Sequence, residues 1–133
     1  MRGEGTVLIV DDEEIVRRTA HTALQRYGYS VVLAENGRQG VELFRECHRQ
    51  LFAVILDMTM PVMGGEEALR HMRETNPNVP VILSSGFNEV EAVRRFTGKG
   101  LAGFIQEPYT ARALAEKLPE IRDWGASVHP VGS

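Results

Sequence analysis

Residues 53–65 read AVILDMTMPVMGG, an apolar run that stops abruptly at Asp57. A short apolar run bounded by turn residues is typical of a strand that is buried on both faces. A loop is expected after it, because Pro61 cannot donate a ladder hydrogen bond and the Gly-Gly pair interrupts regular structure. The carboxylate would then lie at the carboxyl end of a buried strand, the edge at which α/β sheets collect ligands. The alternative is that Asp57 simply ends the strand and caps the next helix.

Size and composition are those of one globular domain. The chain has 133 residues and a formal net charge of -3, whereas a nucleic-acid-binding domain usually presents a basic face. Its longest apolar run, LFAVIL, is far shorter than the roughly 20 residues needed to span a bilayer, and no signal-peptide pattern follows MRGEGT. Cys47 is the single cysteine, which excludes an internal disulfide and favours a reducing compartment. We therefore predict a cytoplasmic protein with no membrane span and no direct contact with nucleic acid.

Apolar runs alternate with helical periodicities along the whole chain. Strands are expected at 6–10, 30–34, 51–56, 80–83 and 101–105, and helices at 13–27, 37–48, 66–75, 90–96 and from 110 onward. This alternation predicts an α/β fold with a five-stranded parallel sheet, doubly wound in the flavodoxin-like order 2-1-3-4-5, and five helices. The domain is expected over 5–123, and 124–133 are expected to form a C-terminal tail or linker.

The expected helix over 13–27 shows how the faces are assigned. One apolar stripe is expected to face the core, and its members are Ile15, Val16, Thr19, Ala20, Ala23, Leu24 and Tyr27. Arg17 and Arg18 lie opposite that stripe, so both are expected on a solvated helix face.

Three carboxylates follow strands that meet in the predicted sheet. Asp11 and Asp12 end the first strand and Asp57 ends the third, and the switch point of this strand order lies between those two strands. Carboxylates held close together repel, and an all-oxygen site with open positions suits Mg²⁺. An aspartate can also act as a nucleophile and form an aspartyl-phosphate. The pattern favours a Mg²⁺-dependent phospho-acceptor, and the alternative is a plain acidic pocket at a sheet edge.

Four motifs carry a family resemblance, namely VLIVDDE, VILDMTMPVMGG, PVILSSG and GFIQEPY. In order and spacing they resemble the receiver domains of two-component response regulators over about residues 5–123. The resemblance implies a non-enzymatic phosphorelay domain that takes a phosphoryl group from a histidine kinase or phosphotransfer protein onto Asp57. The GTVLIVDDE and ILSSG motifs resemble, in particular, receivers attached to hybrid sensor histidine kinases.

By this resemblance, Asp12, Asp57 and the backbone carbonyl of Thr59 would hold Mg²⁺, and Asp11 would reach the ion through water. Ser85 would be the switch hydroxyl that bonds a phosphoryl oxygen. Movement of Ser85 would let the switch aromatic residue repack, which is a two-state element of the kind that a phosphorylation switch requires.

The same resemblance assigns the switch aromatic to Phe104. It would couple the site to the face made by the fourth helix, fifth strand and fifth helix, which family members use to form a homodimer or to contact an output domain.

One position departs from the family pattern. The family has a lysine immediately before Pro108, and this sequence has Glu107 there. A carboxylate in place of an ammonium reverses the charge beside the phosphoryl group. We expect the acidic Mg²⁺ site to remain while phosphoryl stabilisation and switching weaken. The alternative is a degenerate receiver that acts as a protein-interaction module without phosphorylation.

Two other classes start from a similar sequence. A phosphohydrolase of the haloacid-dehalogenase type also uses a strand-terminal aspartate, but it needs a second aspartate two residues later, where this chain has Thr59. A flavin carrier needs a phosphate-binding loop rich in Ser, Thr or Gly after the first strand, and none follows it here. Both classes fit less well than a receiver.

Overall fold

A computed structural model describes residues 5–58, 60–86, 94, 101–106 and 109–120. Its strands are β1 (Thr6–Val10), β2 (Ser30–Ala34), β3 (Leu51–Asp57), β4 (Val81–Ser85) and β5 (Gly103–Gln106). Its helices are α1 (Glu14–Arg26), α2 (Gly37–Cys47), α3 (Gly65–Thr75), α5 (Ala111–Glu120) and the short 3-10 helix η1 (His48–Gln50). The helix expected over 90–96 falls, apart from Arg94, outside the described residues.

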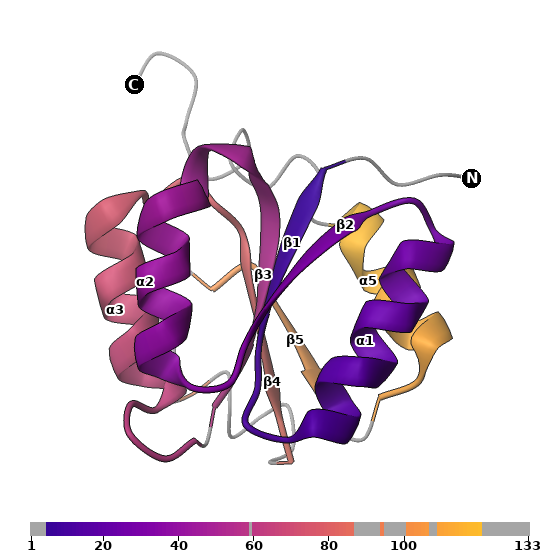
Figure 1. The fold of residues 1–133 in the computed structure, drawn as a ribbon, viewed down its shortest axis with the longest axis horizontal. Coiled ribbons are helices and arrows are strands. Elements are labelled where there is room, and N and C mark those ends of the chain that lie inside the picture. The colour runs from indigo at the N-terminus through magenta and orange to yellow at the C-terminus, as the bar shows by residue number, and fades with distance from the viewer. Residues whose placement is uncertain (1–4, 59, 87–93, 95–100, 107–108, 121–133) are drawn as a thin grey trace.

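The five strands form one parallel sheet in the order β2-β1-β3-β4-β5. This confirms the predicted strand order and doubly wound architecture. Helices α2 and α3 cover one face of the sheet, and α1 and α5 cover the other (Figure 1). Strand β3 lies in the middle, and all but one of its seven residues are buried, as expected for a parallel strand covered on both faces.

Alternate residues of each strand enter different hydrophobic cores. Leu56 and Leu83 pack in the core that contains residues of α2 and α3. Ile55 and Ile82 pack in the core that contains residues of α1 and α5. This period of two follows from the pleat of a strand, and it shows which face each residue near the strand ends occupies.

Two strand boundaries differ from the prediction by two residues, and the others differ by no more than one. Strand β4 continues through Ser84 and Ser85, because the Met58 amide donates to the Ser84 carbonyl at 2.9 Å and so extends the pairing with β3. Strand β5 begins at Gly103, two residues later than expected, since its first partner on β4 is Ile82.

Helix α1 buries the middle of the expected stripe but not its two ends. Ala20 and Leu24 are fully buried, whereas Ile15 is 71% exposed. The helix turns by about 100° per residue, so the positions in line with Ala20 and Leu24 on the first turn are Val16 and Arg17. The prediction that Ile15 faces the core is therefore wrong, and so is the same prediction for Tyr27, which is 40% exposed. The prediction that Arg17 is solvated is also wrong, because its side chain is only 13% exposed.

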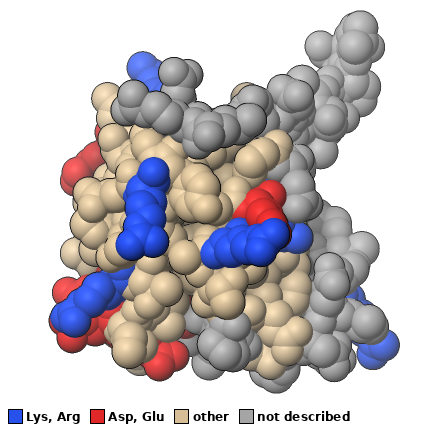
Figure 2. All heavy atoms as spheres, turned by 90° about the vertical axis from the view of Figure 1, so that its right-hand side faces the viewer, with Lys and Arg blue, Asp and Glu red and all other residues tan. Residues whose placement is uncertain are grey.

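The surface that α1 and α5 provide carries mixed charge. Figure 2 shows its described Lys and Arg side chains scattered over an uncharged surface instead of gathered into a stripe. Two of the basic side chains bond acidic ones on the same helix, Arg18 with Glu14 at 3.3 Å and Arg112 with Glu116 at 3.0 Å. Within the described ranges, no helix is long and apolar enough to cross a membrane.

Candidate functional site

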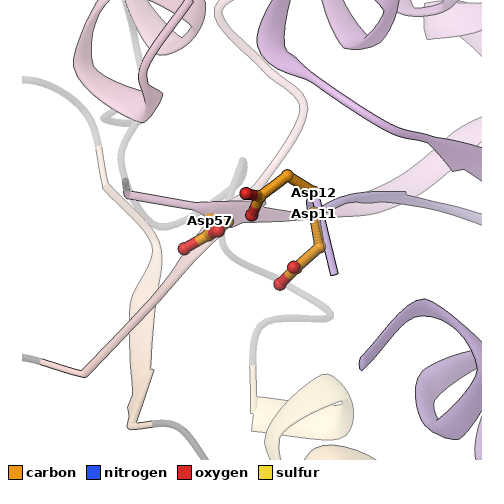
Figure 3. Close-up of side chains that lie close together, drawn as sticks. All are labelled: Asp11, Asp12 and Asp57. Atoms are coloured by element: carbon orange, nitrogen blue, oxygen red, sulfur yellow. The ribbon is translucent and has the colours of Figure 1, made fainter. Parts of the chain in front are cut away.

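Three carboxylates come together at the carboxyl edge of the sheet. Asp11 and Asp12 follow β1, Asp57 is the last residue of β3, and these two strands are neighbours. One oxygen from each side chain lies within 4.8 Å of the others, and Figure 3 shows the three side chains gathered at this edge. The structure therefore places Asp11, Asp12 and Asp57 side by side, as the sequence predicted.

Burial differs among the three side chains. Asp11 is 1% exposed and Asp57 is 6% exposed, while Asp12 lies in the solvent-facing part of the turn. The Asp11 carboxylate accepts a hydrogen bond from the Glu13 amide at 2.9 Å, which fixes the turn between β1 and α1. Oxygen-only ligands of this kind are those that hard divalent cations such as Mg²⁺ prefer. The donor set fits the predicted metal.

Met58 and Gly65, at the two ends of the loop that follows Asp57, pack closely against the rest of the domain. Met58 is 6% exposed and belongs to the core, and its carbonyl accepts a hydrogen bond from the Gly65 amide at 2.9 Å. A Cβ on Gly65 would lie 2.6 Å from the Asp57 carbonyl oxygen and 2.8 Å from the Met58 Cα. Only glycine allows the first turn of α3 to approach the backbone of Asp57 this closely.

Arg17 is a residue of the site region that the sequence argument missed. Its guanidinium donates to the Asp11 backbone carbonyl at 2.7 Å and lies 3.8 Å from the Glu35 carboxylate, which follows β2. The side chain thus ties α1 to the turn that carries Asp11 and Asp12. The signal that could have found it is its position one helical turn before Ala20 and two turns before Leu24, both fully buried.

Replacing Arg17 by alanine is expected to lower the free energy of unfolding by about 1–2 kcal/mol, since a charge-assisted hydrogen bond to a buried carbonyl is lost. Arg18→Ala is the matched control, because its neighbouring guanidinium is 73% exposed and bonds only an exposed glutamate. It should change stability by less than about 0.5 kcal/mol. Urea denaturation of both variants measures the difference, and equal losses would contradict the role given to Arg17.

The two switch residues predicted for the site lie on adjacent strands. Ser85 ends β4 and is 2% exposed, and Phe104 lies in β5 and is 7% exposed. Leu83 pairs with Phe104 in the β4–β5 register, so Ser85, two residues after Leu83, faces the same side of the sheet as Phe104. Thr59, Glu107 and Pro108 lie outside the described residues.

Comparison with known proteins identifies the fold and the family. The family model for the response regulator receiver domain matches residues 7–119. The chain belongs to the response regulator receiver domain family. The receiver is 34% identical over 121 residues to the sensor kinase CckA of Brucella abortus, which covers 91% of this chain. It is 31% identical over 116 residues to the chemotaxis protein CheY of Thermotoga maritima, covering 86% of this chain and 95% of that protein.

A solved structure gives the same result in three dimensions. A chain in the CheX-CheY-BeF3-Mg²⁺ complex from Borrelia burgdorferi matches the receiver with a TM-score of 0.83 and 25% identity, covering 88% of each chain. The relatives differ greatly in length. The matched region spans only 13% of CckA but 95% of CheY. The family and the fold are thus established for a domain that occurs both alone and inside much longer proteins.

Proposed function

We propose that this receiver domain accepts a phosphoryl group on Asp57 in a Mg²⁺-dependent step of a two-component phosphorelay. The observation that carries the proposal is the convergence of Asp11, Asp12 and Asp57, whose oxygens lie within 4.8 Å of one another. Neither a structural role nor strand capping requires three carboxylates at one sheet edge. A site for a cation and a phosphoryl group does, because their charges offset those of the carboxylates.

Each residue has a definite part in the proposed reaction. Asp12, Asp57 and the carbonyl of Thr59 would hold Mg²⁺, and Asp11 would reach the ion through water. The ion would supply positive charge to the carboxylates and to the phosphoryl oxygens. An oxygen of the Asp57 carboxylate bonds to phosphorus as the bond from phosphorus to the donor breaks, and the leaving group of the donor takes up a proton. Asp57 is held in place for this step by β3 before it and by the close approach of Gly65 after it.

A histidine kinase or a phosphotransfer protein is the donor that we propose. Ile15, 71% exposed in the first turn of α1 and three residues after Asp12, supports a contact surface beside the site. Ser85 and Phe104, which face the same side of the sheet, support the proposed switch toward a homodimer or output-domain contact.

We place the phosphoryl transfer in the cytoplasm, where the single cysteine, Cys47, stays reduced. Burial and the neighbouring Glu46 raise the pKa of its thiol.

Glu107 favours a second candidate function, a degenerate receiver that binds partners without phosphorylation. The residue reverses the charge at the position where the family has lysine. A like charge about 4 Å from a phosphoryl oxygen costs on the order of 4 kcal/mol at an effective dielectric of about 20. The two functions differ in one observable, which is the ability of Asp57 to take up a phosphoryl group.

Glu107→Lys is therefore expected to increase the lifetime of phosphorylated Asp57 by at least about 10-fold. An ion pair between the introduced lysine and the phosphoryl group that stabilises the phosphorylated state by about 1.4 kcal/mol already gives that factor. Wild type and variant are incubated with acetyl phosphate and Mg²⁺, and intact mass spectrometry follows the phosphorylated fraction. Phosphorylation of both chains, with a longer lifetime in the variant, supports the proposal. A wild-type chain that takes no label while Glu107→Lys does supports the degenerate receiver instead.

A further inference from the structure

Ser84 carries a buried hydroxyl group that the proposed function leaves unused. The residue is 1% exposed, and its Oγ has no hydrogen-bond partner in the part of the chain that the structure describes. A buried hydroxyl without a partner costs about 1–3 kcal/mol. A valine, isoleucine or leucine would fill a strand position of this kind without that cost, so the hydroxyl needs an explanation.

The position of Ser84 in the sheet places its side chain beside the phospho-acceptor. Ser84 pairs directly with Asp57 in the β3–β4 register, and paired residues of neighbouring parallel strands project from the same face. Ser85, the predicted switch hydroxyl, projects from the opposite face. Neighbouring strands are about 4.8 Å apart, a spacing across which two short polar side chains on the same face can form a hydrogen bond.

We propose that the Ser84 hydroxyl donates a hydrogen bond to the Asp57 carboxyl group as the aspartyl-phosphate is hydrolysed. This inference rests on the proposed function. In the hydrolysis a water oxygen bonds to phosphorus and the bond between phosphorus and the Asp57 oxygen breaks. The electron pair of that bond stays on the carboxylate, and a water proton passes to the phosphate product or to solvent.

Negative charge grows on the Asp57 carboxyl group during this step. A hydrogen bond to it is therefore stronger in the transition state than in the aspartyl-phosphate, and it speeds the step. The same bond stabilises the free carboxylate over the phosphorylated one. Ser84 thus shortens the lifetime of the phosphorylated state, and it does so from the face of the sheet opposite to the switch hydroxyl.

Ser84→Ala is the variant that tests the inference, because it removes only the hydroxyl oxygen. The phosphorylated chain is prepared with acetyl phosphate and Mg²⁺, the donor is removed, and intact mass spectrometry follows the loss of the phosphoryl group. We expect the rate constant for loss of the phosphoryl group to fall about 3- to 10-fold in Ser84→Ala. The variant lacks one hydrogen bond to a carboxyl group whose negative charge is partly developed in the transition state. Ser84→Thr, which keeps the hydroxyl, should stay within about 2-fold of wild type.

A second measurement separates this role from a structural one. Without Mg²⁺ or phosphodonor, Ser84→Ala should unfold at the same temperature as wild type or higher, since it removes a buried hydroxyl without a partner. Equal rates of phosphoryl loss in wild type and Ser84→Ala would overturn the inference and leave the proposed function standing. A wild-type chain that takes no label would overturn the proposed function, and the inference with it.

Discussion

Asp57→Asn is expected to unfold at a higher temperature than the wild-type receiver when Mg²⁺ is absent, and to gain less stability than the wild type when Mg²⁺ is added. The reason is the repulsion among three carboxylates whose oxygens lie within 4.8 Å of one another. Two like charges at about that separation repel by about 3 kcal/mol at an effective dielectric of about 20. Because Asp12 faces solvent and is screened, we expect a gain in the free energy of unfolding of about 1–2 kcal/mol.

Added Mg²⁺ should stabilise the wild-type chain more than the asparagine variant. Binding to the folded chain alone stabilises it by about 2.7 kcal/mol when the ion is present at 100 times its Kd, and the asparagine variant loses one of the ligands. Thermal unfolding with and without MgCl₂ measures both effects. Glu42→Gln is the matched control, because it removes one negative charge at an exposed position of α2. An asparagine variant that is less stable than wild type without Mg²⁺, or equally stabilised by it, would contradict the metal site.

Gly65→Ala is expected to lower the free energy of unfolding by about 2–4 kcal/mol. The added Cβ would meet the Asp57 carbonyl oxygen at 2.6 Å and the Met58 Cα at 2.8 Å. Both atoms belong to the backbone and cannot move aside as a side chain could, so α3 must shift away from the end of β3. The loss should appear although alanine is the better helix former by about 1 kcal/mol.

Gly64→Ala is the control for that substitution. Among the described residues, a Cβ at Gly64 would have its only close contact with the Met58 carbonyl oxygen at 3.6 Å, an ordinary van der Waals distance. Its φ of -75° suits any residue, so we expect a change within about 1 kcal/mol. Denaturant titrations of the two variants give the comparison. Similar stabilities for both would show that α3 does not depend on the close approach at Gly65.

The sheet order and the acidic cluster could be predicted because both depend on strong, local signals. The run that ends at Asp57 is apolar on both sides of the pleat, and only a central parallel strand requires that. Once the alternation of strands and helices sets the order, Asp11 and Asp57 must meet at the switch point. The structure confirms this part of the argument without correction.

Features that depend on contacts between elements could not be predicted in the same way. The burial of Arg17 follows from where α1 lies on the sheet, and an arginine in a sequence most often signals a solvated face. The register that pairs Ser84 with Asp57 depends on how far β4 extends, and serine is a poor strand signal. The sequence alone therefore did not relate Ser84 to Asp57.

The most direct test of the account is the location of the phosphoryl group after labelling. The receiver is incubated with acetyl phosphate with and without Mg²⁺, treated with borohydride, which reduces an aspartyl-phosphate to homoserine, and digested for peptide mass spectrometry. We predict homoserine at position 57 in the wild-type chain with Mg²⁺, none when the ion is removed, and none in Asp57→Asn under either condition. Labelling at another residue, or labelling of Asp57 that does not depend on Mg²⁺, would contradict a phospho-acceptor site built from Asp11, Asp12 and Asp57.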